Sequence, residues 1–208
     1  MMIDLKTKDK SKAAFKNARR ALVADVHTIS SVFMGYDEET GRPQFDTKRP
    51  PMGEFVYKLK SCYTQDAAVI PKIVDLLEKE NEFINLINDI DFIVPIPPSK
   101  KNRAVQPTIA VAEEISKKFG KPTKKDFIIS SNTDQVKAID STERYDVVKK
   151  GLSLTPDVIF NKNAKILLFD DVLDTASTIK AIIDTLVSEG YTDISVLMLT
   201  ITRKSGLE

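Results

Sequence analysis

The sequence predicts an α/β fold with a central, mostly parallel sheet flanked by helices. Three observations lead to this prediction. From residue 54 onward, short apolar segments of strand length alternate with longer segments whose apolar residues recur at helical spacing. Residues 165–169 form an apolar segment of the type that is buried on both faces of a parallel sheet. The chain has 208 residues, of which 42% are hydrophobic, and this suits one globular core with a small appendage.

The residues before position 54 are predicted to form an N-terminal extension. A helix near the N-terminus is favoured by Ala13, Ala14, Ala18, Ala21 and Leu22, and we expect the many Lys and Arg side chains there to face solvent. Contact with a phosphate backbone is the alternative for these charges. Residues 37–53 are rich in turn formers and end in two prolines and a glycine, which predicts a loop. We therefore expect a helix and loop extension over residues 1–53 and an α/β domain over residues 54–204.

The domain begins with a strand in this prediction, because apolar and polar residues alternate over residues 55–59. The elements expected after it are a helix over 67–86, a strand over 91–96, a helix over 104–119, strands over 127–129 and 165–169, a helix over 178–187 and a strand over 194–201. Ligands of open parallel sheets bind beyond the carboxyl ends of the strands. The residues directly after each strand are therefore the first candidates for a site.

Composition excludes several classes of function. The chain has 31 Lys and Arg residues against 30 Asp and Glu, so it lacks the overall positive field that would favour a nucleic-acid partner. One Cys and one His leave little material for a disulfide, a zinc site or a Ser-His-Asp triad. No apolar run approaches the roughly 18–20 residues of a membrane span, and the N-terminus is charged. We therefore expect no membrane association and a cytoplasmic location.

The segment after the predicted strand at 165–169 combines acids with a hydroxyl-rich helix start. Asp170 and Asp171 follow the strand directly, Asp174 comes three residues later, and residues 175–178 read Thr-Ala-Ser-Thr. A helix N-terminus binds anions, while carboxylates accept hydrogen bonds from sugar hydroxyls or bind Mg²⁺. The combination suits a ligand with a phosphate at one end and hydroxyls or a metal at the other. A plain helix cap is the alternative, but it does not account for two acids directly after a strand.

This segment, ILLF-DD-VL-D-TAST, resembles the phosphoribosyl-diphosphate (PRPP) motif of type I phosphoribosyltransferases. The resemblance implies that Asp170 and Asp171 face the ribose hydroxyls, with Mg²⁺ held through the same pair. Asp174 stands where purine phosphoribosyltransferases often carry the acid that manages the base proton, so these three acids are the catalytic candidates. The residues that the resemblance places around the 5-phosphate are Thr175, Ala176, Ser177 and Thr178. The family usually has at least one Gly in this loop, where Gly permits positive φ and a close phosphate approach.

Other segments resemble the ComF-like amidophosphoribosyltransferase branch of the family. They are FVYKLK at 55–60, IVPIPPSKKNR at 93–103, DQVKAIDSTERYDVVKKGL at 134–152 and LTITR at 199–203. The resemblance covers about residues 54–203 and implies a type I phosphoribosyltransferase-like domain with a flexible hood segment. Two features of the branch are absent: an N-terminal cysteine zinc module and an Arg-Gly-Phe-Asn element after the second strand.

Two polar segments complete the predicted site. The basic loop at the end of the second predicted strand would bind pyrophosphate through Pro98, Ser99, Lys100, Lys101 and Arg103. A surface loop that caps the next helix is the alternative. Residues 130–150 are long and polar for a connection, and the resemblance implies a hood over PRPP with Gln135 and Arg144 as contacts. A solvated hairpin is the alternative for this segment.

The implied function is a Mg²⁺-dependent phosphoribosyltransferase, a pentosyltransferase of nucleotide metabolism. Such an enzyme moves the 5-phosphoribosyl group from PRPP to a nitrogen acceptor, here a purine-like base if Asp174 acts as suggested, and releases pyrophosphate. The expected partners are PRPP and the nitrogenous acceptor, and a homodimer is the usual form in this class. The alternative is a non-catalytic module on the same fold that senses PRPP or a nucleotide or binds a partner.

Overall fold

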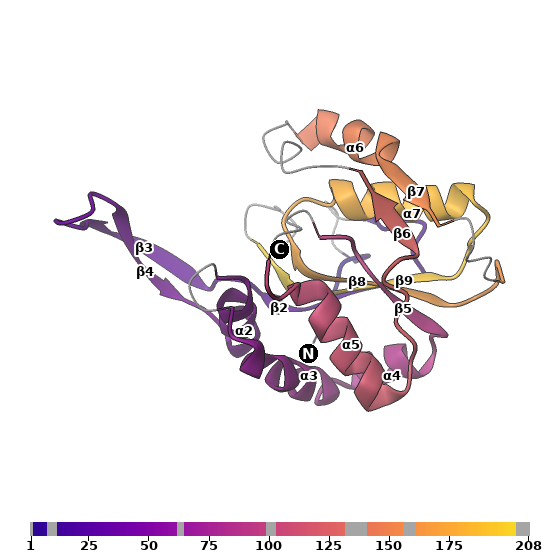
Figure 1. The fold of residues 1–208 in the computed structure, drawn as a ribbon, viewed down its shortest axis with the longest axis horizontal. Coiled ribbons are helices and arrows are strands. Elements are labelled where there is room, and N and C mark those ends of the chain that lie inside the picture. The colour runs from indigo at the N-terminus through magenta and orange to yellow at the C-terminus, as the bar shows by residue number, and fades with distance from the viewer. Residues whose placement is uncertain are drawn as a thin grey trace.

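The computed structural model describes residues 2–7, 12–61, 65–98, 103–131, 141–155 and 161–202, and it contains a five-stranded central sheet (Figure 1). In spatial order the strands are β1 (Ile3–Asp4), β2 (Arg20–Val26), β9 (Ile194–Ile201), β8 (Ile166–Leu173) and β5 (Phe92–Pro95). All neighbours are parallel except β1, which pairs antiparallel with β2 at one edge. The predicted α/β architecture with a mostly parallel sheet is confirmed.

Helices cover both faces of this sheet (Figure 1). One face carries α2 (Pro51–Lys60), α3 (Ile70–Glu78), α4 (Asn81–Asn88) and α5 (Pro107–Phe119). The other face carries α7 (Ser177–Ser188) and part of the N-terminal segment. Successive residues of β8 serve the two faces in turn, since Leu167 packs with the first group and Leu168 with the second. The sheet therefore separates two apolar clusters.

The N-terminal segment differs from the predicted leader helix. Ala21 and Leu22, which we expected in that helix, lie in β2, and Phe15 and Ala18 are buried against the sheet. Residues 1–53 therefore contribute β1 and β2 to the central sheet, although we described them as an extension. The alanines that favoured a helix fit a buried strand and its approach equally well, because they are small and apolar.

The predicted strand over residues 55–59 is also wrong, since these residues lie in α2. Met52, Val56 and Leu59 are buried on one side of that helix, at the spacing of a helical stripe. Pro51 stands in the first turn, where its missing N–H costs nothing. The strand-like alternation extends over five residues only, too short to outweigh the helical spacing.

A close backbone approach fixes the position of α2. A Cβ atom added at Gly53 would lie 2.4 Å from the carbonyl oxygen of His27, just beyond the end of β2. Only glycine allows this approach, so the start of α2 is seated against the carboxyl end of β2. The far end of the same helix carries Lys60 toward β8, which is separated from β2 by β9.

The later helices and strands follow the prediction more closely. The helix expected over 67–86 is broken into a short 3₁₀ turn (Ala67–Val69), α3 and α4, because Glu80 is extended, with φ −97° and ψ 115°. Helix α5 ends at Gly120, which is left-handed with φ 69°. Strand β8 continues to Leu173, so Asp170 and Asp171 lie in the second half of the strand rather than after it.

Two small antiparallel sheets lie outside the central one. Strands β3 (Ser30–Tyr36) and β4 (Pro43–Lys48) form a hairpin that projects from the body (Figure 1), so the loop predicted over residues 37–53 is wrong for most of its length. Strands β6 (Ile128–Ser130) and β7 (Leu152–Leu154) pair beside the sheet, with α6 (Ser141–Lys150) between them in sequence. Helix α6 lies against α7 (Figure 1).

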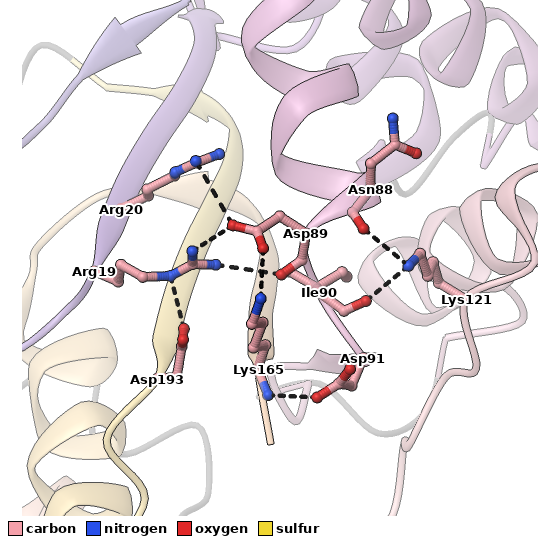
Figure 2. Close-up of polar contacts among 9 residues, drawn as sticks. All are labelled: Arg19, Arg20, Asn88, Asp89, Ile90, Asp91, Lys121, Lys165 and Asp193. Carbon is pink, nitrogen blue, oxygen red and sulfur yellow. Dashed lines mark hydrogen bonds and ion pairs between the residues drawn. The ribbon is translucent and has the colours of Figure 1, made fainter. Parts of the chain in front are cut away.

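Ion pairs join the amino ends of the parallel strands (Figure 2). Asp89, between α4 and β5, accepts hydrogen bonds from Arg19 at the start of β2 and from Lys165 at the start of β8, the latter at 2.7 Å. The Arg19 Nε lies 2.7 Å from Asp193, which precedes β9. The amino ends of the parallel strands are therefore joined by ion pairs, and the pocket lies at their carboxyl ends.

Candidate functional site

A pocket of about 450 Å³ opens at the carboxyl ends of β5, β8 and β9. Its wall includes the last residues of β8, the start of α7, the start of α5, the end of α2 and one side of α6. This is the position that parallel α/β sheets reserve for ligands, as the sequence predicted. The volume falls in the range of small-molecule sites.

Asp170 and Asp171 both line the pocket, but their partners differ. Asp171 is 5% exposed, and Lys60 Nζ donates to its Oδ1 at 2.9 Å. Asp170 Oδ1 accepts a hydrogen bond from Thr108 Oγ1 at 3.1 Å, and another from the backbone N–H of Asp171 at 2.8 Å. The acid pair is therefore fixed from two helices, α2 and α5, on one face of the sheet.

Burial raises the pKa of Asp170 to about 7, and the adjacent Asp171 charge acts in the same direction. The ammonium of Lys60 and the hydrogen bonds to Asp170 oppose this shift without cancelling it. Near neutral pH, Asp170 therefore exists in both its protonated and its ionised form. In the first it can donate a hydrogen bond, and in the second it can only accept.

The start of α7 reaches the pocket through two of the four residues that we expect around a phosphate. Thr175 and Thr178 line the pocket, whereas Ala176 and Ser177 do not. Ala176 is the N-cap residue with φ −73° and ψ −1°, an ordinary right-handed conformation that alanine adopts without strain. The usual glycine is therefore not needed for this loop conformation. Helix α7 has twelve residues, and its amino end, which carries the positive end of the helix dipole, is directed at the pocket through Thr175 and Thr178.

Asp174 lies between the acid pair and this helix start. It is exposed, lines the pocket, and accepts a hydrogen bond from Thr202 Oγ1 at 2.9 Å. Thr202 follows β9, so the contact links the ends of two neighbouring strands. An exposed carboxylate at the mouth of a pocket can exchange protons with both a ligand and the solvent.

The segment expected to form a hood is represented by α6 and its flanking strands. Arg144 of α6 lines the pocket, and its guanidinium donates to Thr175 Oγ1 at 3.3 Å. The neighbouring Tyr145 hydroxyl donates to Asp184 of α7 at 2.7 Å, and Lys180 Nζ donates to the same carboxylate oxygen at 2.7 Å. These contacts hold α6 where Arg144 reaches Thr175 at the start of α7. The second predicted contact, Gln135, lies outside the described residues.

The basic loop is described only at its two ends. Pro98 and Arg103 line the pocket, which brings a guanidinium to the same cavity as the acid pair. The predicted residues Ser99, Lys100 and Lys101 lie outside the described part of the chain.

Sequence reasoning missed two residues that the structure places beside the acids, Lys60 and Thr108. Lys60 was visible in the FVYKLK segment, but the wrong strand assignment gave its side chain no direction. Thr108 is the second residue of α5. A hydroxyl residue at the start of a helix that follows a strand is the sequence signal that indicates such a pocket residue.

A metal ion at this site would need oxygen ligands from outside the chain. Within the described residues, no group of three or more His, Cys, Asp and Glu side chains is placed to hold a metal ion. Mg²⁺ prefers six oxygen ligands, and here Asp171 is already paired with Lys60. The acid pair therefore fits Mg²⁺ only as a minor ligand beside phosphate oxygens and water.

Comparisons of the chain with family models, curated proteins and solved structures find no match. In the part of the chain that the structure describes, every helix is too short or too polar to cross a membrane. The function is therefore inferred from the pocket and its side chains.

Proposed function

We propose that the pocket binds PRPP and that the chain transfers its 5-phosphoribosyl group to a nitrogen nucleophile, releasing pyrophosphate. One observation carries the proposal: the acid pair of β8 and the hydroxyl-bearing N-terminus of α7 face one cavity. Few ligands need sugar-hydroxyl acceptors and a phosphate site together, and a phosphorylated ribose is the simplest of them.

Each group has a defined role in this proposal. Asp170 and Asp171 accept hydrogen bonds from the ribose hydroxyls, and Lys60 orients the Asp171 carboxylate. The N–H groups of α7, with Thr175 and Thr178, bind the 5-phosphate. The type I phosphoribosyltransferase-like identity of the fold, with α6 as its hood, belongs to the same proposal.

The reaction breaks the bond between C1 of the ribose and the diphosphate oxygen and forms a bond from C1 to the acceptor nitrogen. The diphosphate leaves with the bonding electrons, and Arg103 and Arg144 lie in the pocket wall where they can stabilise that charge. Mg²⁺, held mainly by the diphosphate oxygens, would neutralise the same charge. The proton lost by the acceptor nitrogen passes to Asp174, the exposed carboxylate at the pocket.

Calorimetric titration tests the binding step. We expect the chain to bind PRPP more tightly with Mg²⁺ than without it, and ribose 5-phosphate more weakly than PRPP. The double variant Asp170→Asn, Asp171→Asn should lose at least about ten-fold in affinity for PRPP, since two charged hydrogen-bond acceptors are replaced. The matched control is Asp46→Asn in β4. Asp46 does not line the pocket, so this variant should leave the affinity for PRPP unchanged.

Pyrophosphate release with a panel of nitrogen acceptors tests the transfer step. Release that depends on an acceptor supports the enzyme. PRPP binding without release on any acceptor would replace transfer by ligand sensing, and the absence of PRPP binding in the folded chain would overturn the proposal.

A further inference from the structure

The β3–β4 hairpin, residues 30–48, is an arm that extends away from the body of the molecule (Figure 1). Its strands pair with each other and with no other described strand. Five of its apolar side chains are at least half exposed: Val32, Phe33, Met34, Tyr36 and Phe45. An apolar set of this size on a projecting element marks an interaction surface.

The arm needs more stabilisation than it has in one chain. The Phe33 ring contacts the rings of Tyr36 and Phe45, with centroids 5.3 and 5.6 Å apart, but all three remain half exposed. A two-stranded hairpin alone in water is marginally stable. Burying these rings against a second surface would supply the missing apolar contact.

The two outer edges of the arm are not alike. Strand β4 begins with Pro43 and carries Asp46 and Lys48, features that oppose pairing with a further strand. Strand β3 reads SSVFMGY and contains neither a charged residue nor a proline. Its register shift lies between Phe33 and Gly35, toward the tip, so the half nearer the body is regular. The edge of β3 is therefore the one open to pairing.

The charges of the arm identify the partner as a second copy of the chain. The turn at the tip, residues 37–42, carries three acids and one arginine, whereas the base carries Lys48 and Arg49. When two β3 edges pair antiparallel about a two-fold axis, the tip of each arm lies along the base of the other. Acidic tips then face basic bases, and the uncharged β3 strands meet without repulsion.

We infer that the arm is a dimerisation element, in which two copies of the chain pair antiparallel through β3 and bury the exposed aromatic residues. The pairing satisfies the free backbone groups of both edges in a four-stranded sheet. This inference is independent of the proposed function, because none of the arm residues lines the pocket.

Sedimentation equilibrium of the full chain tests the inference. We expect a dimer at micromolar concentration, and a monomer for Phe33→Lys, which places like charges close together in the paired strands. The matched control is Val187→Lys, an exposed apolar residue of α7, which should remain dimeric. Circular dichroism verifies that each variant is folded. The inference is overturned if the natural chain is a monomer, in which case the arm serves another macromolecule. It is also overturned if Phe33→Lys leaves the dimer intact.

Charge exchange tests the antiparallel arrangement without touching the apolar residues. Glu38→Lys with Glu39→Lys makes the tip basic. Lys48→Glu makes the base acidic once Asp46 is counted with it, since the net charge of residues 46–49 changes from +1 to −1. Each variant alone should dimerise about ten-fold more weakly, because tip and base then carry like charges. Mixing the two should restore association, since every tip again faces an opposite base. Asp37 and Arg49 are kept, as Asp37 orders the turn and Arg49 stacks on Tyr57. Failure of the mixture to associate better than either variant would overturn the arrangement.

Discussion

Asp170 and Asp171 are adjacent in sequence and share one pocket, yet their surroundings assign them different tasks. Asp171 lies against the Lys60 ammonium, which compensates its charge. Asp170 has only hydrogen bonds from a hydroxyl and a backbone N–H, and burial raises its pKa to about 7. Asp170 therefore changes its protonation state within the physiological range.

Asp170→Asn should change how stability depends on pH. Because the folded pKa lies above the unfolded value, protonated Asp170 favours the fold below about pH 4, and this contribution is lost as the pH rises toward 7. Asparagine keeps the acceptor oxygen and removes the titration. We expect the variant to gain at least about 1 kcal/mol relative to the natural chain between pH 4 and pH 8. Urea unfolding at several pH values measures this difference, and a constant difference across that range would contradict the assignment.

At this scale the acid pair was predictable and its environment was not. Two aspartates after an apolar segment are visible in the letters, as are Thr175 and Thr178 at the following helix start. Lys60 is 111 residues away from Asp171, and its contact exists only because α2 is a helix packed on β2 and β9, from which Lys60 at its end reaches β8. Long-range partners of this kind depend on packing, which local patterns do not encode.

At the scale of elements, the contact between α6 and α7 decides whether Arg144 reaches the pocket. Helix α6 is polar, with few buried residues, so side-chain bonds contribute more to its position than apolar packing does. The carboxylate of Asp184 collects the bonds from Tyr145 and Lys180, and the Lys180 ammonium lies 4.0 Å from the centre of the Tyr145 ring. Asp184 of α7 is thus the residue that holds α6 in place through Tyr145.

Tyr145→Phe should loosen α6 while leaving its aromatic packing in place. The variant loses one hydrogen bond to a charged acceptor, a change of about 1–3 kcal/mol in the local opening free energy. Hydrogen exchange of the α6 amides should therefore become faster, with the amides of β8 unchanged. Tyr36→Phe on the arm is the control and should leave α6 as it is. Equal protection of α6 in Tyr145→Phe and the natural chain would show that another contact holds α6 in place.

The elements that sequence patterns predicted best are those with long, consistent signals. Helix α5 and strand β9 were placed within a few residues, because a glycine ends the first and a continuous apolar run marks the second. Residues 55–59 were misassigned because five residues satisfy both strand and helix periodicity. The arm was missed because its strands carry exposed residues on both faces, and a half-buried strand pattern never develops.

At the scale of the whole molecule, the two ends of the parallel strands differ. Ion pairs around Asp89 join the amino ends (Figure 2), and the pocket lies at the carboxyl ends. Hydrogen bonds from Lys165 and then from Arg19 hold the pKa of Asp89 well below its usual range. Charge pairing is thus concentrated at the amino ends of the strands, opposite the pocket.

Asp89→Asn should lower the melting temperature at neutral pH. The folded pKa of Asp89 is depressed, so its stabilising contribution is fully present above about pH 4 and is lost only as the pH falls well below that value. The gap in melting temperature between variant and natural chain should therefore be open at pH 7 and close in strong acid. High salt should narrow it as well, since the pairs are partly exposed. Asp75→Asn, which removes an exposed partner of Lys118, serves as the control and should have a smaller effect.

The arm leaves the body and returns to it at almost the same place. Ile29 donates its backbone N–H to the carbonyl of Lys48 at 2.8 Å, and the chain then resumes directly in α2 beside His27. A segment joined in this way can change in length and sequence without disturbing the body, because its two attachment points stay fixed. Changes in the arm therefore need not alter the pocket, so the two parts of the molecule can diverge separately during evolution.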